Sequence, residues 1–123
     1  MESTEPNPTW DPAAHSETVQ ALEAAVGEVT YHVWGADWCG DCRSVLPDLF
    51  AALAAAGIPD REIEVHEVDE EKDGELVEKY DVTHIPTIVV EQGDEVLARF
   101  EESEDLPAAE HIGRELLDSD SLA

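Results

Sequence analysis

Residues 30–43, TYHVWGADWCGDCR, decide the fold because they place the chain's only two cysteines where one structural pattern gives way to another. The β-branched and aromatic run over 30–34 predicts a central strand, whereas the apolar positions after Cys42 recur at helical spacing. A thiol at the start of a helix meets unpaired backbone N–H groups and the positive end of the helix dipole, and both favour the thiolate. A C-x-x-C pair in such a turn is typical of a dithiol–disulfide redox site.

The sequence on either side of this stretch predicts alternating helices and strands. Asp11 is a good N-cap residue and Pro12 suits a first helical turn, so the first helix is expected from residue 12. Its apolar residues keep helical spacing as far as Gly27. The predicted helices cover 12–26, 41–56, 76–80 and 106–117. The predicted strands cover 30–34, 61–68, 85–90 and 95–100, and Gly93-Asp94 connects the last two as a hairpin.

This element order predicts an α/β fold with three layers, in which a mixed four-stranded sheet carries helices on both faces. The first two strands flank a helix and therefore require a right-handed parallel crossover, while the last two form an antiparallel pair. In the second strand, alternation directs Val65 inward and His66 outward. The length of 123 residues suits one domain. We expect a flexible acidic arm over 1–11, the domain over 12–118 and a flexible C-terminus over 119–123.

The chain is strongly acidic, with 31 aspartates and glutamates against six lysines and arginines and a net charge of −25. Nucleic acids and anionic membranes would repel such a protein, so neither is expected as a partner. The acidic residues run along the whole chain, which favours the solvated surface of a salt-adapted prokaryotic protein over a local patch for a basic partner. A hydrophobic fraction of 42% in periodic runs argues against disorder.

No apolar stretch is long enough to span a bilayer, and the first residues lack the basic start and apolar run of a signal peptide. We therefore expect a cytoplasmic protein and a monomer. In a reducing compartment, a C-x-x-C pair is more suited to redox cycling than to structural bridging.

Four segments resemble the thioredoxin superfamily, and the resemblance covers residues 12–118. The segments are ADWCGDCR at 36–43, Pro47 five residues after Cys42, Val68-Asp69 at a strand end, and Ile85-Pro86-Thr87. The resemblance implies a thioredoxin fold in which a cis-proline, Pro86, faces the cysteines. It also implies that Cys39 is the exposed nucleophile and Cys42 the buried resolving thiol, and that a flavin-dependent thioredoxin reductase recharges the pair.

The chain departs from the family pattern at three places. Gly40-Asp41 stands where thioredoxins usually have Gly-Pro, and a carboxylate beside the sulfurs disfavours the thiolate, which predicts a reductant instead of a strong oxidant. The family's buried Asp and its companion Lys fall on Val33 and Val65. The glycine-containing loop after the last strand becomes the acidic segment 101–104.

Further site residues flank the cysteines or the proline. Trp38 is expected to support the cysteine loop and to offer an apolar surface to the substrate. Ile85 is expected to pair, strand-like, with an incoming peptide. His84 either stabilises the Cys39 thiolate as imidazolium and moves its proton, or is an exposed loop histidine without a role.

These features predict a thiol–disulfide oxidoreductase that reduces protein disulfides and carries no cofactor or metal, since no nucleotide fingerprint is present. One alternative is a non-catalytic thioredoxin-fold binding module or redox sensor. Another is a metal- or cluster-binding protein. A structural zinc site needs four ligands, so it would require two of His32, His66 and His84 to reach the cysteines. An iron–sulfur cluster bridged between two chains has no further cysteine to support it.

Overall fold

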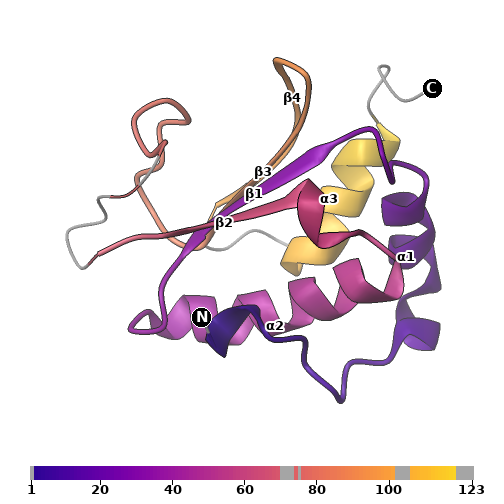
Figure 1. The fold of residues 1–123 in the computed structure, drawn as a ribbon. Coiled ribbons are helices and arrows are strands. Elements are labelled where there is room, and N and C mark those ends of the chain that lie inside the picture. Colours follow the sequence, from indigo (N-terminus) through magenta and orange to yellow (C-terminus); the bar gives the residue numbers. More distant parts are fainter. Residues whose placement is uncertain (1, 70–73, 75, 102–105, 119–123) are drawn as a thin grey trace.

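The computed structural model describes residues 2–69, 74, 76–101 and 106–118. A four-stranded sheet in the order β2-β1-β3-β4 forms its centre (Figure 1). β1 pairs in parallel with β2 and antiparallel with β3, and β3 pairs antiparallel with β4. The mixed sheet is therefore as predicted. The strands are β1 (Thr30–Gly35), β2 (Ile63–Glu67), β3 (Thr87–Gln92) and β4 (Glu95–Glu101).

Three α-helices, α1 (Ser16–Glu23), α2 (Gly40–Ala55) and α3 (Ala108–Leu117), pack against one another and lie together on one side of the sheet (Figure 1). Gly35, at the end of β1, faces this side. A Cβ atom there would lie 2.9 Å from Leu46 Cδ1 and 3.3 Å from Cys42 Sγ, so the absence of a side chain lets α2 approach the sheet. The core between sheet and helices contains fully buried Leu22, Leu49 and Ile112.

The opposite face of the sheet is covered by turns. Here Tyr80 packs on His32 and Trp34, with ring centroids 5.0 Å and 5.2 Å away. The helix predicted over 76–80 is wrong, because the described residues there form successive turns and Leu76 has φ +64°. A five-residue apolar pattern is too short for helix propagation to offset the cost of nucleation. Helices were predicted on both faces of the sheet, but the α-helices of the described residues all lie on one face.

The first predicted helix is shorter than its apolar pattern. Asp11 does cap the segment, since its side chain accepts a hydrogen bond from the Ala13 amide at 3.0 Å. A 3₁₀ turn over Pro12–His15 precedes α1, which ends at Glu23 instead of residue 26. The following residues form tight turns, and Gly27 adopts φ +84°, a conformation that L side chains rarely take.

The N-terminal segment lies along α2 in the structure (Figure 1), in contrast to the free arm expected over 1–11. The Ser3 amide and hydroxyl both donate to Asp37 Oδ1 at 3.0 Å. The Asn7 backbone amide donates to the Pro47 carbonyl at 3.0 Å. Trp10 stacks on His15 with ring centroids 4.7 Å apart. The C-terminus predicted over 119–123 lies outside the described residues.

Side chains alternate along β2 as predicted, but the burial of two of them is opposite to the expectation. His66 is only 8% exposed, whereas Val65 is 41% exposed. The parallel register pairs His66 with Trp34 and Val65 with Val33, so His66 joins the aromatic face of the sheet and Val65 lies on the edge strand of the helical face. No helix in the described part of the chain has the length and apolar character needed to cross a bilayer.

Candidate active site

Cys39 is the N-cap residue of α2. Its backbone is extended, and its Sγ accepts a hydrogen bond from the Cys42 amide at 3.2 Å. The sulfur therefore takes the place of a capping oxygen, at the position where the helix dipole and the free N–H groups stabilise a negative charge. Cys39 was expected to be exposed, but only 8% of it is, because Ala36 and Ile85 pack around it in the hydrophobic core.

Cys42 lies one helical turn deeper and is fully buried. Burial, with smaller contributions from the hydrogen bond to Cys39 and from the Asp41 charge, raises the pKa of the Cys42 thiol to about 12. Cys42 therefore stays protonated at neutral pH. The structure thus gives the two cysteines different surroundings: Cys39 lies at the helix end and Cys42 in an apolar interior.

The segment before β3 approaches Cys39. The Ile85–Pro86 peptide bond is cis, as the resemblance implied. The Cys39 thiol donates to the Ile85 carbonyl oxygen, with sulfur and oxygen 3.8 Å apart. The Thr87 hydroxyl donates to the His84 carbonyl at 2.6 Å and fixes the turn that carries this segment. Two stretches more than forty residues apart in sequence are therefore brought together at the sulfur.

Trp38 covers the cysteine loop from outside. It is 47% exposed, and its Nε1 donates to the Val68 carbonyl at 3.3 Å, which ties the loop to the segment after β2. Gly40 and Asp41 are both exposed in the first turn of α2. The apolar indole and the Asp41 carboxylate thus border the sulfur on its solvent side.

His84 lies on the exposed turn before Ile85. Its Nδ1 is 3.0 Å from the Thr83 hydroxyl. The turn places this imidazole one residue from the carbonyl that contacts Cys39. A proton-transfer role for His84 stays a prediction.

The two valines that replace the family's buried charges are direct neighbours in the sheet. Val33 on β1 and Val65 on β2 are Cα partners, so the region below the cysteines lacks a carboxylate from this pair. Of the acidic loop expected over 101–104, Glu101 ends β4 and the other residues lie outside the described part of the chain.

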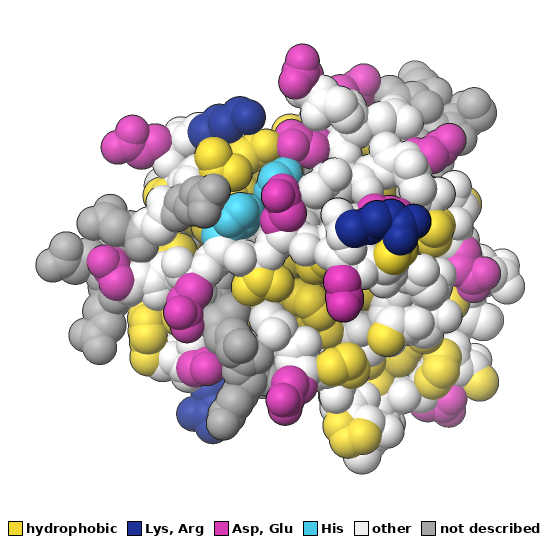
Figure 2. All heavy atoms as spheres, in the orientation of Figure 1, with side chains coloured by type: hydrophobic (Ala, Val, Ile, Leu, Met, Phe, Trp, Pro, Cys, Tyr) yellow, Lys and Arg dark blue, Asp and Glu magenta, His cyan; other side chains and the backbone are white. Residues whose placement is uncertain are grey.

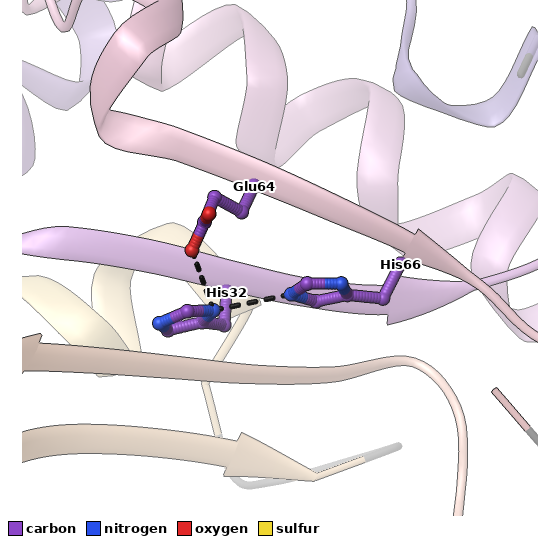
Figure 3. A group of neighbouring side chains, drawn as sticks. All are labelled: His32, Glu64 and His66. Atoms are coloured by element: carbon purple, nitrogen blue, oxygen red, sulfur yellow. Dashed lines mark hydrogen bonds and ion pairs between the residues drawn. The ribbon is translucent and has the colours of Figure 1, made fainter. Parts of the chain in front are cut away.

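The sequence missed a second polar cluster. His32, Glu64 and His66 converge on the face of the sheet opposite the helices (Figure 3). Among the described residues, this is the one group in which three possible metal ligands converge, and neither cysteine belongs to it. The zinc site considered from the sequence, with histidines reaching the cysteines, is therefore not formed by these residues. The sequence signal for this cluster was the period-two spacing of Glu64 and His66 within one strand. The register between β1 and β2 was needed to place His32 beside them.

Acidic side chains are scattered over the face of the molecule shown in Figure 2. On the face shown, Lys and Arg side chains are few and histidine side chains lie beside acidic ones. This distribution matches the even spread of acidic residues along the sequence.

Comparisons with known proteins point to one family. The thioredoxin family model matches residues 12–112. The thioredoxin of Streptomyces clavuligerus is 37% identical over 62 residues, which are 50% of this chain and 54% of that protein. The protein disulfide isomerase-like 1-4 of Oryza sativa subsp. japonica is 37% identical over 54 residues, which are 44% of this chain and 10% of that protein. The matches thus span about half of the first relative and a tenth of the second.

Solved structures of thioredoxins share the fold. The X-ray structure of Fasciola hepatica thioredoxin is 28% identical in sequence and has a TM-score of 0.52, covering 84% of this chain and 93% of that one. A mutant thioredoxin from Halobacterium salinarum is 23% identical and has a TM-score of 0.50, with 74% of each chain covered. The predicted thioredoxin fold with its mixed four-stranded sheet is confirmed by the family match and by this structural similarity.

Proposed function

The chain belongs to the thioredoxin family, and we propose that it reduces protein disulfides by cycling Cys39 and Cys42 between dithiol and disulfide. The observation that carries the proposal is the unequal setting of the two sulfurs. Cys39 Sγ caps α2 beside the Ile85 carbonyl, whereas Cys42 is buried with a raised pKa. The first sulfur has the surroundings of a nucleophile and the second those of a resolving thiol held in reserve.

In the first step, the Cys39 thiolate attacks one sulfur of the substrate disulfide. The bond between the substrate sulfurs breaks, a bond to Cys39 forms, and the second substrate sulfur leaves as a thiolate that takes up a proton. In the next step, Cys42 loses its proton and attacks Cys39 Sγ. The bond between Cys39 and the substrate sulfur breaks, and that sulfur leaves as a thiolate that takes up a proton. The two electrons gained by the substrate come from the Cys39 and Cys42 thiols, which are oxidised to a disulfide. His84 is proposed as the group that moves the proton.

Substrate binding is assigned to the surface around Cys39. Trp38 offers an exposed apolar ring, and the space beside Gly40 is open, because a Cβ there would meet no atom within 4 Å. Backbone groups of Ile85 lie where an extended peptide could pair with them, and Pro86 follows as an apolar contact. Asp41 disfavours negatively charged substrates at this surface.

The proposed setting is the cytoplasm of a salt-adapted prokaryote, with a thioredoxin reductase returning electrons by thiol exchange and the chain acting as a monomer. The net charge of −25 and the scattered acidic surface support salt adaptation, because molar salt shortens the Debye length to about 3 Å and screens repulsion between the acidic side chains. We propose that the thioredoxin-like domain spans residues 12–118.

The proposal is tested by turnover. The purified chain is mixed with a disulfide-bonded peptide and a small dithiol, and free peptide thiols are counted over time. We expect catalysis by the wild type and loss to the uncatalysed rate in Cys39→Ser and Cys42→Ser. The exposed Ser44→Ala serves as the matched control and should retain activity. Wild-type turnover equal to the uncatalysed rate would favour a binding module or redox sensor and refute the reductase.

A further inference from the structure

The cluster of His32, Glu64 and His66 is built by strand register. His32 pairs with Glu64 across β1 and β2, and Trp34 pairs with His66. Because side chains alternate along each strand, this register places His32, Glu64 and His66 on the same face. His32 and His66 are 4% and 8% exposed, and both rings are enclosed in the structure. Figure 3 shows the three side chains pointing toward one another from the two strands.

The spacing of their polar atoms suits a shared cation. His32 Nδ1 lies 3.1 Å from His66 Nε2 and 3.2 Å from Glu64 Oε2. One ligand atom from each residue lies within 4.8 Å of the others. Two ligand atoms bound at about 2.0–2.1 Å to a tetrahedral ion lie about 3.3–3.4 Å apart. The distances from His32 Nδ1 to His66 Nε2 and to Glu64 Oε2 therefore need to lengthen only slightly.

The outer partner of His32 fixes the orientation of its ring. His32 Nε2 lies 2.9 Å from Glu91 Oε1, and the same oxygen accepts the Tyr80 hydroxyl at 2.7 Å. A carboxylate oxygen can only accept, so Nε2 carries the hydrogen and Nδ1 is the nitrogen that faces His66 and Glu64. Nδ1 is therefore placed to bind a cation together with the Glu64 carboxylate. A carboxylate holding the far N–H of a ligating histidine is typical of metal sites.

The surrounding aromatic rings hold both imidazoles in place. Trp34 packs on His66 with ring centroids 5.0 Å apart, and Tyr80 packs on His32 at the same distance. The Glu64 side chain is 54% exposed and leaves one side of the cluster open to solvent. The two nitrogens are therefore preorganised, and the carboxylate can close on an ion that enters from outside.

We propose that His32, His66 and Glu64 bind one divalent transition-metal ion of the Zn²⁺ type, with water completing its coordination on the open side and Glu91 as a positioning residue. Two imidazole nitrogens and one carboxylate suit Zn²⁺ and disfavour the hard, oxygen-seeking Mg²⁺ and Ca²⁺. The site is separate from the cysteines and does not depend on the proposed reductase activity.

The test is calorimetric titration of the full, untagged chain with Zn²⁺ in the presence of excess Mg²⁺ and moderate salt. Cys39 and Cys42 are both replaced by serine so that no thiolate can bind the metal. We expect one ion per chain, and a loss of affinity of at least about tenfold in Glu64→Gln and His66→Gln. Glu91→Gln should cost about 10–100-fold, as is usual for a group that holds a ligating histidine.

The matched control is His15→Gln, because His15 and Glu110 form a pair at 3.1 Å that belongs to no three-ligand group among the described residues. Its affinity should equal that of the parent chain. Glu64→Gln changes an exposed side chain and keeps the test valid if His66→Gln fails to fold. A Co²⁺ spectrum should show the d–d bands of nitrogen and oxygen ligands.

Two outcomes would overturn the site. One is displacement of Zn²⁺ by excess Mg²⁺ together with equal affinities for the parent chain and Glu64→Gln, since this is the behaviour of diffuse binding to an acidic surface. The other is a set of NMR signals from His32 and His66 that respond to pH but not to Zn²⁺, which would mean that the cluster holds a proton only.

Discussion

Cys39 Sγ lies 3.8 Å from the carbonyl oxygen of Ile85. The contact joins the first turn of α2 to the segment entering β3, and it places the sulfur beside the backbone that we propose to pair with an extended peptide. A substrate disulfide carried by such a peptide would reach the sulfur and the backbone at the same time. The expectations below follow from this arrangement and from its packing.

Salt should stabilise the protein. The net charge of −25 implies strong repulsion in the folded state, which is relieved as the Debye length falls from about 10 Å at 0.1 M salt to about 3 Å at 1 M. The melting temperature should therefore rise steadily with NaCl. Thermal unfolding followed by circular dichroism measures this, with sucrose of equal osmolality as the control. A melting temperature that is flat or falls with NaCl would contradict the salt-adapted surface.

Tyr31→Phe should raise stability by about 1 kcal/mol at neutral pH. Tyr31 is fully buried, and among the described residues its hydroxyl finds no hydrogen-bond partner, so removing it relieves an uncompensated burial cost. Burial and the Glu62 charge raise the pKa of this phenol. The wild type is therefore unaffected below about pH 10, the ordinary pKa of tyrosine, and loses stability above it, which widens its difference from Tyr31→Phe.

Urea unfolding of Tyr31→Phe is compared with that of Tyr80→Phe. The Tyr80 hydroxyl donates to Glu91 at 2.7 Å, so its removal should cost about 0.5–1.5 kcal/mol. Equal effects of the two substitutions would contradict the hydrogen-bond assignment.

Gly35→Ala should destabilise the fold by about 1–3 kcal/mol. Its Cβ would lie 2.9 Å from Leu46 Cδ1 and 3.3 Å from Cys42 Sγ, so these fully buried side chains must shift inside a closely packed core. Gly40→Ala is the control, because its Cβ would meet no atom within 4 Å. We expect no loss there, and a gain of up to about 1 kcal/mol from reduced backbone freedom. Equal unfolding midpoints for the two variants would refute the close approach at Gly35.

His84→Ala should slow alkylation of Cys39 more in acidic than in alkaline solution, because an imidazolium beside the sulfur favours the thiolate and a neutral imidazole does not. The measurement is the iodoacetamide rate of the Cys42→Ser chain with and without His84→Ala, and His111→Ala is the control away from the cysteines. Rate profiles that superimpose across the whole pH range would remove His84 from the mechanism.

The sequence was sufficient for those parts of the fold that depend on local pattern. The β-branched run at 30–34, the cysteine turn and the hairpin at Gly93-Asp94 each have a local signature, and β1, α2 and the β3–β4 pair follow them closely. The helix expected over 76–80 failed because its pattern was short and the segment is held by contacts such as Tyr80 on Trp34. Tertiary packing decided that segment.

Only those parts of the candidate site that have a motif in the sequence could be predicted. C-x-x-C spacing and Ile85-Pro86-Thr87 identified the two halves of the redox site, and the resemblance brought them together. The low exposure of Cys39 and the contacts of His32 with Glu64 and His66 depend on strand register and helix placement, which alternation alone does not give. Val65 and His66 show this directly, since their burial is opposite to the prediction.

The central claim, that Cys39 attacks and Cys42 resolves, is tested most directly by intact-mass spectrometry of single-cysteine chains. Cys42→Ser is incubated with a disulfide-bonded peptide without any reductant, beside Cys39→Ser under the same conditions. We predict that Cys42→Ser gains the mass of one peptide chain as a stable mixed disulfide, while Cys39→Ser, whose remaining thiol is fully buried with a raised pKa, stays unmodified. Equal modification of both variants, or of Cys39→Ser alone, would contradict the assignment.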